Sequence, residues 1–150
     1  MPIDIFVIGL LLSMLLGALI GWQREWTGKA AGSRTYALVC VGSYLFTILS
    51  IYGFQTNDTA RIAAQIITGI GFLGAGTIIH KKNSVEGLTT AAGLWAIAAI
   101  GMTVGVGWYP HAAVGTILLF AIVWFNDKKI MANHHCDEPK KSMQKKKYQP

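Results

Sequence analysis

The chain has 150 residues, enough for one domain, and 53% of them are hydrophobic whereas only 13% are charged. That charged fraction is about half the value of an ordinary soluble domain, which excludes that class of protein. The net charge of +6 comes mostly from the lysines between Lys128 and Lys147, so it gives little support to nucleic-acid binding. These values indicate a membrane protein with a basic end.

Five apolar runs approach the length of about 20 residues that a helix needs to cross a bilayer. Four of them contain no charge: Ile5–Trp22, Tyr36–Phe54, Ile62–Ile79 and Leu88–Gly107. The fifth, His111–Phe125, reaches spanning length when Tyr109, Pro110 and Asn126 are added. The sequence therefore predicts an all-α membrane protein with five transmembrane helices in residues 1–126. Residues 127–150 are expected to form a basic, disordered tail.

The positions of Lys and Arg predict the orientation, because short cytoplasmic loops carry an excess of both. One set of alternate connections holds nearly all of these residues: Arg24, Lys29, Arg34, Lys81, Lys82, Lys128 and Lys129. The opposite set holds only Arg61. We therefore expect the N-terminus outside the cytoplasm and the C-terminus inside it.

Small residues recur at helical spacing in three of the expected spans. Glycines that would let helices pack closely are Gly17, Gly21, Gly69, Gly71, Gly74, Gly76, Gly101 and Gly105. The segment Gly69–Gly74 matches G-x-G-x-x-G, but no strand precedes it and no soluble helix follows, so a nucleotide site is rejected. The glycine-rich third span has two interpretations: close helix packing, which we favour, or a break that exposes backbone carbonyls to a cavity.

A charged island, "GWQREWTGKAAGSRT", separates the first two spans and holds Arg24, Glu25, Lys29 and Arg34. It has two interpretations. It is either a cationic anchor, for which any Lys or Arg serves, or an ordered polar structure. Arg24 and Glu25 are adjacent on an extended first helix, so they point apart and need different partners, whereas Trp22 and Trp26 share a face.

Other polar residues have local explanations. Asp58 or Thr59 is expected to cap the third span, with Arg61 within reach of Asp58, and Thr89 and Thr90 are expected to cap the fourth. Gln65 and Thr68 are expected to form hydrogen bonds across helices. The contiguous donors His134 to Glu138 do not have the spacing of a metal site. We expect no catalytic residues, no cofactor and no metal, and the lack of a carboxylate at mid-membrane gives a cation pore little support.

Three segments together resemble the bacterial MgtC/SapB membrane proteins: "GALIGWQREWTGKAAGSRTYALVCVGS", "RIAAQIITGIGFLGAGTII" and "GLTTAAGLWAIAAIGM". The positions that match the family's three motifs are, for the first, Gly17, Gly21, Arg24, Trp26, Gly32, Arg34 and Thr35; for the second, Arg61, Ala63, Ala64, Gln65, Gly69, Gly71, Phe72, Gly74 and Gly76; and for the third, Gly87, Leu88, Thr90, Ala91 and Ala92. This chain departs from family members that have Glu at Gln23, Asn at Thr89 or Cys at Ala96. Many members also carry a cytoplasmic domain after the spans.

The resemblance implies five spans in the bacterial cytoplasmic membrane, with the N-terminus outside. It also implies a link to growth at low magnesium, to virulence in pathogens, and in some members to restraint of the F-type ATP synthase. We therefore expect a regulator that binds another membrane complex, with transport of magnesium or another ion as the alternative. The small-residue faces further favour a homodimer.

Overall fold

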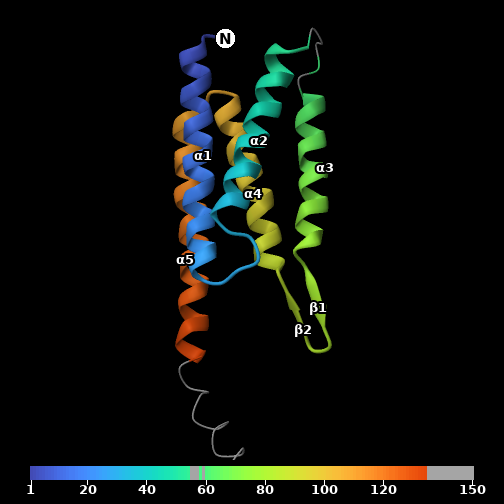
Figure 1. Ribbon diagram of the computed structural model, residues 1–150, viewed down its shortest axis with the longest axis vertical. Coiled ribbons are helices and arrows are strands. Elements are labelled where there is room, and N and C mark those ends of the chain that lie inside the picture. Colours follow the sequence, from blue (N-terminus) through green and yellow to red (C-terminus); the bar gives the residue numbers. More distant parts are fainter. Residues whose placement is uncertain (55–57, 59, 135–150) are drawn as a thin grey trace, which may run out of the picture.

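The computed structural model describes residues 1–54, 58 and 60–134, with side chains described as far as Phe125. The elements of this part are α1 (Ile3–Trp26), α2 (Ser33–Tyr52), α3 (Ala60–Gly76), β1 (Ile79–Lys81), β2 (Ser84–Glu86), α4 (Leu88–Gly105) and α5 (Tyr109–His134). The helices lie side by side along the long axis of the molecule (Figure 1). β1 and β2 form an antiparallel hairpin at one end, with His80 opposite Val85.

Three helices, α1, α2 and α4, are long and apolar enough to cross a membrane. α3 and the Tyr109–Phe125 part of α5 are apolar but shorter. The chain is thus mostly helical and has the composition of a membrane protein. The small β-hairpin between α3 and α4 is the departure from the expected all-α fold.

The third expected span is too long at its C-terminal end. α3 ends at Gly76, where Thr77 N–H donates to the carbonyl oxygen of Gly74 at 3.0 Å and Ile78 N–H to that of Ala75 at 3.1 Å. These shorter-range bonds tighten the last turn of the helix. The apolar run continues past α3 into the hairpin, so the end of the helix predicted from apolar composition was too far along the chain. α3 itself is unbroken, which excludes the break considered for its glycine-rich segment.

The last helix extends further than expected. α5 continues to His134, past the expected start of the tail at residue 127. The rest of the tail, including Cys136, Asp137 and Glu138, lies outside the described residues.

α1, α2 and α4 pack closely, and we call them the three-helix unit. Glycines bring their backbones together: a Cβ added at Gly17 would lie 2.7 Å from the Tyr36 carbonyl oxygen, and one added at Gly101 would collide with that of Cys40. The hydrophobic core includes buried apolar residues of α1 and α4, among them Ile20, Ile97 and Val104. Close approach of this kind is how helices gain van der Waals contact in lipid.

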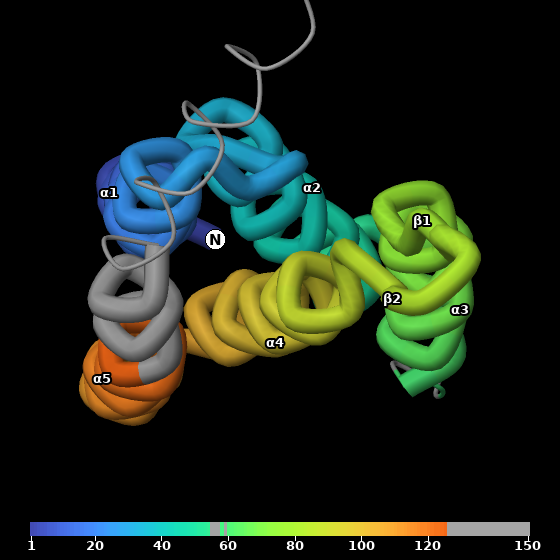
Figure 2. The backbone as a smooth tube through the Cα atoms, turned by 90° about the horizontal axis from the view of Figure 1, so that it is seen from below, coloured from blue at the N-terminus to red at the C-terminus, as the bar shows by residue number. Residues whose placement is uncertain are grey.

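α3 lies at the edge of the bundle, where it contacts α4 and α2 on the side away from α1 and α5 (Figure 2). Ile66 and Ile70 are buried against these neighbours. Gly74 makes an ordinary contact with α4, since a Cβ there would lie 3.5 Å from Ala91 Cβ. The packing of α3 is thus looser than that within the three-helix unit.

Candidate functional site

The connection between α1 and α2 begins with a sharp reversal. The Thr27 hydroxyl donates to the carbonyl oxygens of Gln23 and Arg24, both at 3.1 Å, and ends α1. Gly28 follows with a φ of +69°, a left-handed conformation that glycine adopts without steric cost. Its N–H donates to the carbonyl oxygen of Glu25 at 3.0 Å. The chain therefore turns back toward α2 within a few residues.

Glu25 joins the end of α1 to the start of α2. Its Oε2 accepts hydrogen bonds from the Ser33 N–H at 3.1 Å and from the Ser33 hydroxyl at 2.6 Å. A carboxylate in this place also interacts favourably with the N-terminal end of the helix dipole. Gly32 leaves room for it, because a Cβ there would lie 2.9 Å from the same oxygen.

Arg24 points into the bundle and is only 1% exposed. Its Nη2 donates to Thr90 Oγ1 of α4 at 3.5 Å, and the Tyr36 hydroxyl of α2 donates to the Thr90 carbonyl oxygen at 3.3 Å. We call Arg24, Tyr36 and Thr90 the polar junction. Gly93 makes room for it, since a Cβ there would collide with the Tyr36 hydroxyl. The polar junction joins all members of the three-helix unit.

The other charges of the island face outward. Lys29 and Arg34 line an open cavity of about 440 Å³ together with Glu25. Trp22 and Trp26 stack, with ring centroids 6.4 Å apart and ring planes at 6°. The island is therefore an ordered structure in which Arg24 and Glu25, adjacent in sequence, have different partners, as helical geometry requires.

The expected caps of the fourth span are wrong. The N-cap of α4 is Gly87, with a φ of +90° and no capping side chain. A Cβ at Gly87 would collide with the carbonyl oxygen of Thr77, so the hairpin holds this position against the end of α3. Thr89 is exposed, and Thr90 belongs to the polar junction. No sequence pattern indicated that a hairpin would precede α4 and determine where it starts.

Arg61 lies in the first turn of α3, and Asp58 shortly precedes that helix in sequence. The start of α3 is at the opposite end of the bundle from the α1–α2 connection (Figure 1). Asp58 and Arg61 are both exposed and line a cavity of about 150 Å³ with Ser50 and Phe54. Thr59, the alternative cap of α3, lies outside the described residues.

The outer part of α3 carries the remaining expected residues. The prediction that Thr68 bonds across helices is wrong, because its hydroxyl donates to the Ala64 carbonyl oxygen of the same helix at 3.2 Å. Gln65 is exposed on the same side of α3. Three of the expected packing glycines, Gly69, Gly71 and Gly76, have no atom within 4 Å of an added Cβ. By contrast, a Cβ at Gly21 or Gly105 would lie 2.6 Å from a neighbouring helix or connection.

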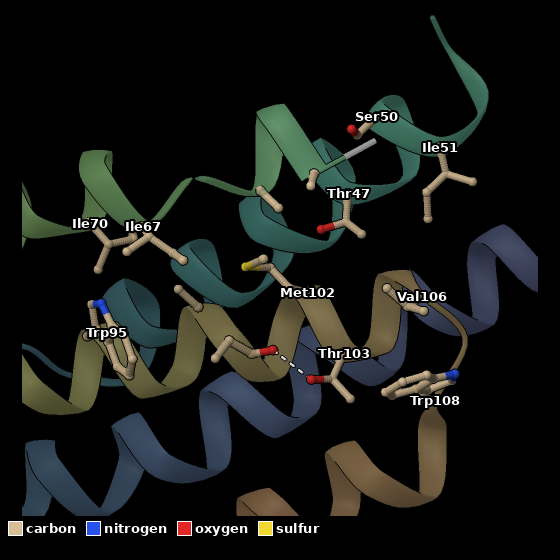
Figure 3. Close-up of a pocket in the computed structure, with 14 residues that line it drawn as sticks. Thr47, Ser50, Ile51, Ile67, Ile70, Trp95, Met102, Thr103, Val106 and Trp108 are labelled. Atoms are coloured by element: carbon tan, nitrogen blue, oxygen red, sulfur yellow. Dashed lines mark hydrogen bonds between the residues drawn. The ribbon is translucent and has the colours of Figure 1, made fainter. Parts of the chain in front are cut away.

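Two grooves flank α3. One, of about 520 Å³, lies between α2, α3 and α4, with Trp95 and Trp108 toward its two ends (Figure 3). The two threonine hydroxyl groups that line it are bonded within their own helices: Thr47 donates to the Ser43 carbonyl oxygen at 2.7 Å and Thr103 to the Ala99 carbonyl oxygen at 2.8 Å. The other groove, of about 500 Å³, lies between α2 and α3. The side chains that line both grooves are mostly apolar.

Sequence reasoning did not identify Tyr36 and Ser33 as site residues. The partner of Tyr36, Thr90, is distant in sequence, and the partner of Ser33, Glu25, comes close only through the turn between α1 and α2. A tyrosine directly after a polar connection was the available signal for Tyr36, since a buried hydroxyl in lipid requires an acceptor.

For metal binding, the part of the chain that the structure describes brings together no group of three or more His, Cys, Asp or Glu side chains.

The comparisons with known proteins agree with one another. The model of the MgtC family matches residues 10–130. The Salmonella typhimurium (strain LT2) protein MgtC is 48% identical, over 76% of this chain and 49% of its own length. The Escherichia coli (strain K12) putative magnesium transporter YhiD is 42% identical, over 79% of this chain and 59% of its own length.

The Brucella abortus (strain 2308) protein MgtC is 46% identical, over 73% of this chain and 46% of its own length. The chain thus spans about half the length of the curated relatives it matches. No solved structure matches. The family model covers most of the chain, including the polar junction and all of α3, and the chain belongs to the MgtC family.

Proposed function

We propose that this protein is a non-enzymatic regulator of magnesium and ATP homeostasis that acts in the bacterial cytoplasmic membrane by binding another membrane complex. In this proposal all five helices cross the bilayer, with the N-terminus outside and the C-terminus in the cytoplasm. The working unit is a homodimer.

The observation that carries the proposal is the contrast between the polar junction and the grooves. Arg24 is buried and bonded to Thr90, so it fixes the three-helix unit. The grooves beside α3 are mostly apolar and open sideways, toward the position of lipid or a neighbouring helix. Such surfaces suit the packing of another helix better than the passage of a hydrated dication, which holds most of its water and favours carboxylates.

The distribution of charge supports the orientation. The α1–α2 connection, the hairpin and the end of α5 lie at the same end of the molecule (Figure 1). That end carries Arg24, Lys29, Arg34, Lys81 and Lys82, and the opposite end carries Arg61. The excess of positive charge predicts that the first end faces the cytoplasm.

The names of the relatives support a role in magnesium homeostasis, and the printed name of YhiD favours transport as the second candidate function. The F-type ATP synthase is the proposed partner, because restraint of that complex is the activity implied by the resemblance. A role in virulence, where the host bacterium is a pathogen, follows from the same resemblance.

Reconstitution separates the two candidates. Purified protein in liposomes loaded with a magnesium-sensitive dye should give no saturable uptake, whereas saturable uptake would replace the regulator with the transporter. In cells, the wild-type gene should restore growth at low magnesium to a deletion strain. Crosslinking in those membranes should capture subunits of the ATP synthase, and failure to capture them would remove that partner.

A further inference from the structure

α3 has an outward face that no other described part of the chain covers. Arg61, Gln65, Thr68 and Phe72 are exposed and follow one another at spacings of four, three and four residues, which place them on one side of a helix. Figure 2 shows α3 at the edge of the bundle. The opposite side of α3 packs on α2 and α4 through Ile66 and Ile70.

The outward face combines glycine positions that carry no side chain with one large, protruding aromatic side chain. Gly69, Gly71 and Gly76 leave open space around their Cα atoms, whereas the Phe72 side chain beside them is 82% exposed. The groove of about 500 Å³ between α2 and α3 adjoins this face and is lined by Gly69 and by Gln65. A large ring beside open glycine positions is a surface to which another helix can fit closely.

The polar groups on this face are poorly suited to lipid. The carboxamide of Gln65 has two donors and an acceptor, and hydrocarbon offers partners to none of them. Two carboxamides related by a two-fold axis satisfy each other, because each contributes both a donor and an acceptor. The same group on an unrelated helix would need a matching polar residue at that depth.

The charged residues at the start of α3 can also pair between two copies of the chain, because each copy carries one acidic and one basic side chain there. Asp58 and Arg61 are exposed and three positions apart. In a parallel pair of α3 helices, Asp58 of one copy lies near Arg61 of the other, and the reverse pair forms on the other side of the axis. An isologous interface repeats every contact twice, so one self-complementary face is sufficient.

We propose that two copies of this chain pair in parallel through the outward face of α3, defined by Arg61, Gln65, Thr68, Gly69, Phe72 and Gly76. Gln65 of each copy bonds to its counterpart, Asp58 pairs with Arg61 across the axis, and Phe72 packs beside Gly69 in the α2–α3 groove of the other copy. This interface rests on the proposed homodimer and specifies the face that forms it.

Disulfide crosslinking in native membranes tests the face. In a Cys136→Ser background, Thr68→Cys and Phe72→Cys should give crosslinked dimers on mild oxidation. The matched controls Leu15→Cys on α1 and Leu118→Cys on α5, which are 61% and 60% exposed, should stay monomeric. Dimers at the control positions alone would overturn the α3 interface while leaving the homodimer intact.

Native mass spectrometry of the wild-type protein in mild detergent separates the remaining outcomes. Dimers there are expected. Monomers alone, with no crosslinking at any position, would remove the homodimer and the interface together. A crosslinked product with the mass of a different protein at Thr68→Cys would show that the face binds another chain and would overturn the pairing of two copies.

A charge-reversal experiment tests the Asp58–Arg61 contact between copies. Asp58→Arg makes this end wholly basic, and Arg61→Asp makes it wholly acidic. When the two variants carry different tags and are expressed together, they should copurify severalfold more than either variant does with itself. Equal copurification would mean that these charges act within one chain, and it would overturn the proposed contact.

Discussion

The three-helix unit and α3 use the same residue type in opposite ways. Gly17, Gly21 and Gly101 lie where a side chain would strike the backbone of a neighbouring helix or connection. Gly69 and Gly71 lie where a side chain would meet open space. The first group holds a bundle together, and the second leaves a surface bare. A glycine-rich segment in a membrane helix therefore indicates close packing only after its neighbours are known.

The largest expected effect comes from adding one methyl group at a closely packed glycine of the three-helix unit. Gly101→Ala should lower the free energy of unfolding by about 3 kcal/mol, because the new Cβ strikes the Cys40 carbonyl oxygen, which moves only if the helices separate. Gly71→Ala is the control and should not destabilise. Thermal unfolding in mild detergent, followed by circular dichroism, measures both. Equal losses would abolish the contrast between the two regions.

The polar junction should be the next most sensitive part. Arg24→Lys keeps the charge but loses the planar guanidinium that reaches Thr90. We therefore expect the free energy of unfolding to fall by about 2 kcal/mol and growth at low magnesium to be weaker. Arg34→Lys changes an exposed side chain and should be silent in both measurements. If Arg24→Lys were silent too, the island would be only a cationic anchor.

Adjacent threonines at the start of α4 provide a finer comparison. Thr90→Val removes the hydroxyl that accepts a hydrogen bond from Arg24. It should lower the free energy of unfolding by about 1.5 kcal/mol, because a buried hydrogen-bond donor loses its acceptor. Thr89→Val alters an exposed side chain and should leave the melting temperature unchanged. A larger loss for Thr89→Val would contradict the assignment of Thr90 to the polar junction.

The smallest effect is expected at the α1–α2 connection. Glu25→Gln weakens the acceptor for the Ser33 N–H and hydroxyl, so residues 28–33 should exchange amide hydrogens faster with little change in melting temperature. Glu86→Gln is the control: it breaks the 2.6 Å ion pair with Lys81 in the hairpin and should leave exchange in residues 28–33 unaltered.

Sequence reasoning succeeded where geometry within one helix decides the answer. The divergence of Arg24 and Glu25 and the shared face of Trp22 and Trp26 follow from about 100° of rotation per residue. It failed where the answer depends on a neighbouring element. The hairpin residues are all exposed, so no alternation of apolar and polar residues marked the strands. The role of Thr90 needed α1 and α4 to be placed together first.

The Arg24–Thr90 hydrogen bond joins residues 66 positions apart, and this separation has a consequence for synthesis. At about 5–20 residues per second, Thr90 leaves the ribosome about 3–13 s after Arg24. Throughout that interval the guanidinium can extend to the headgroups and water at the membrane surface, as long cationic side chains do. The Arg24–Thr90 hydrogen bond can form only after α4 has been made, so the first helix cannot complete its contacts until the fourth one is present.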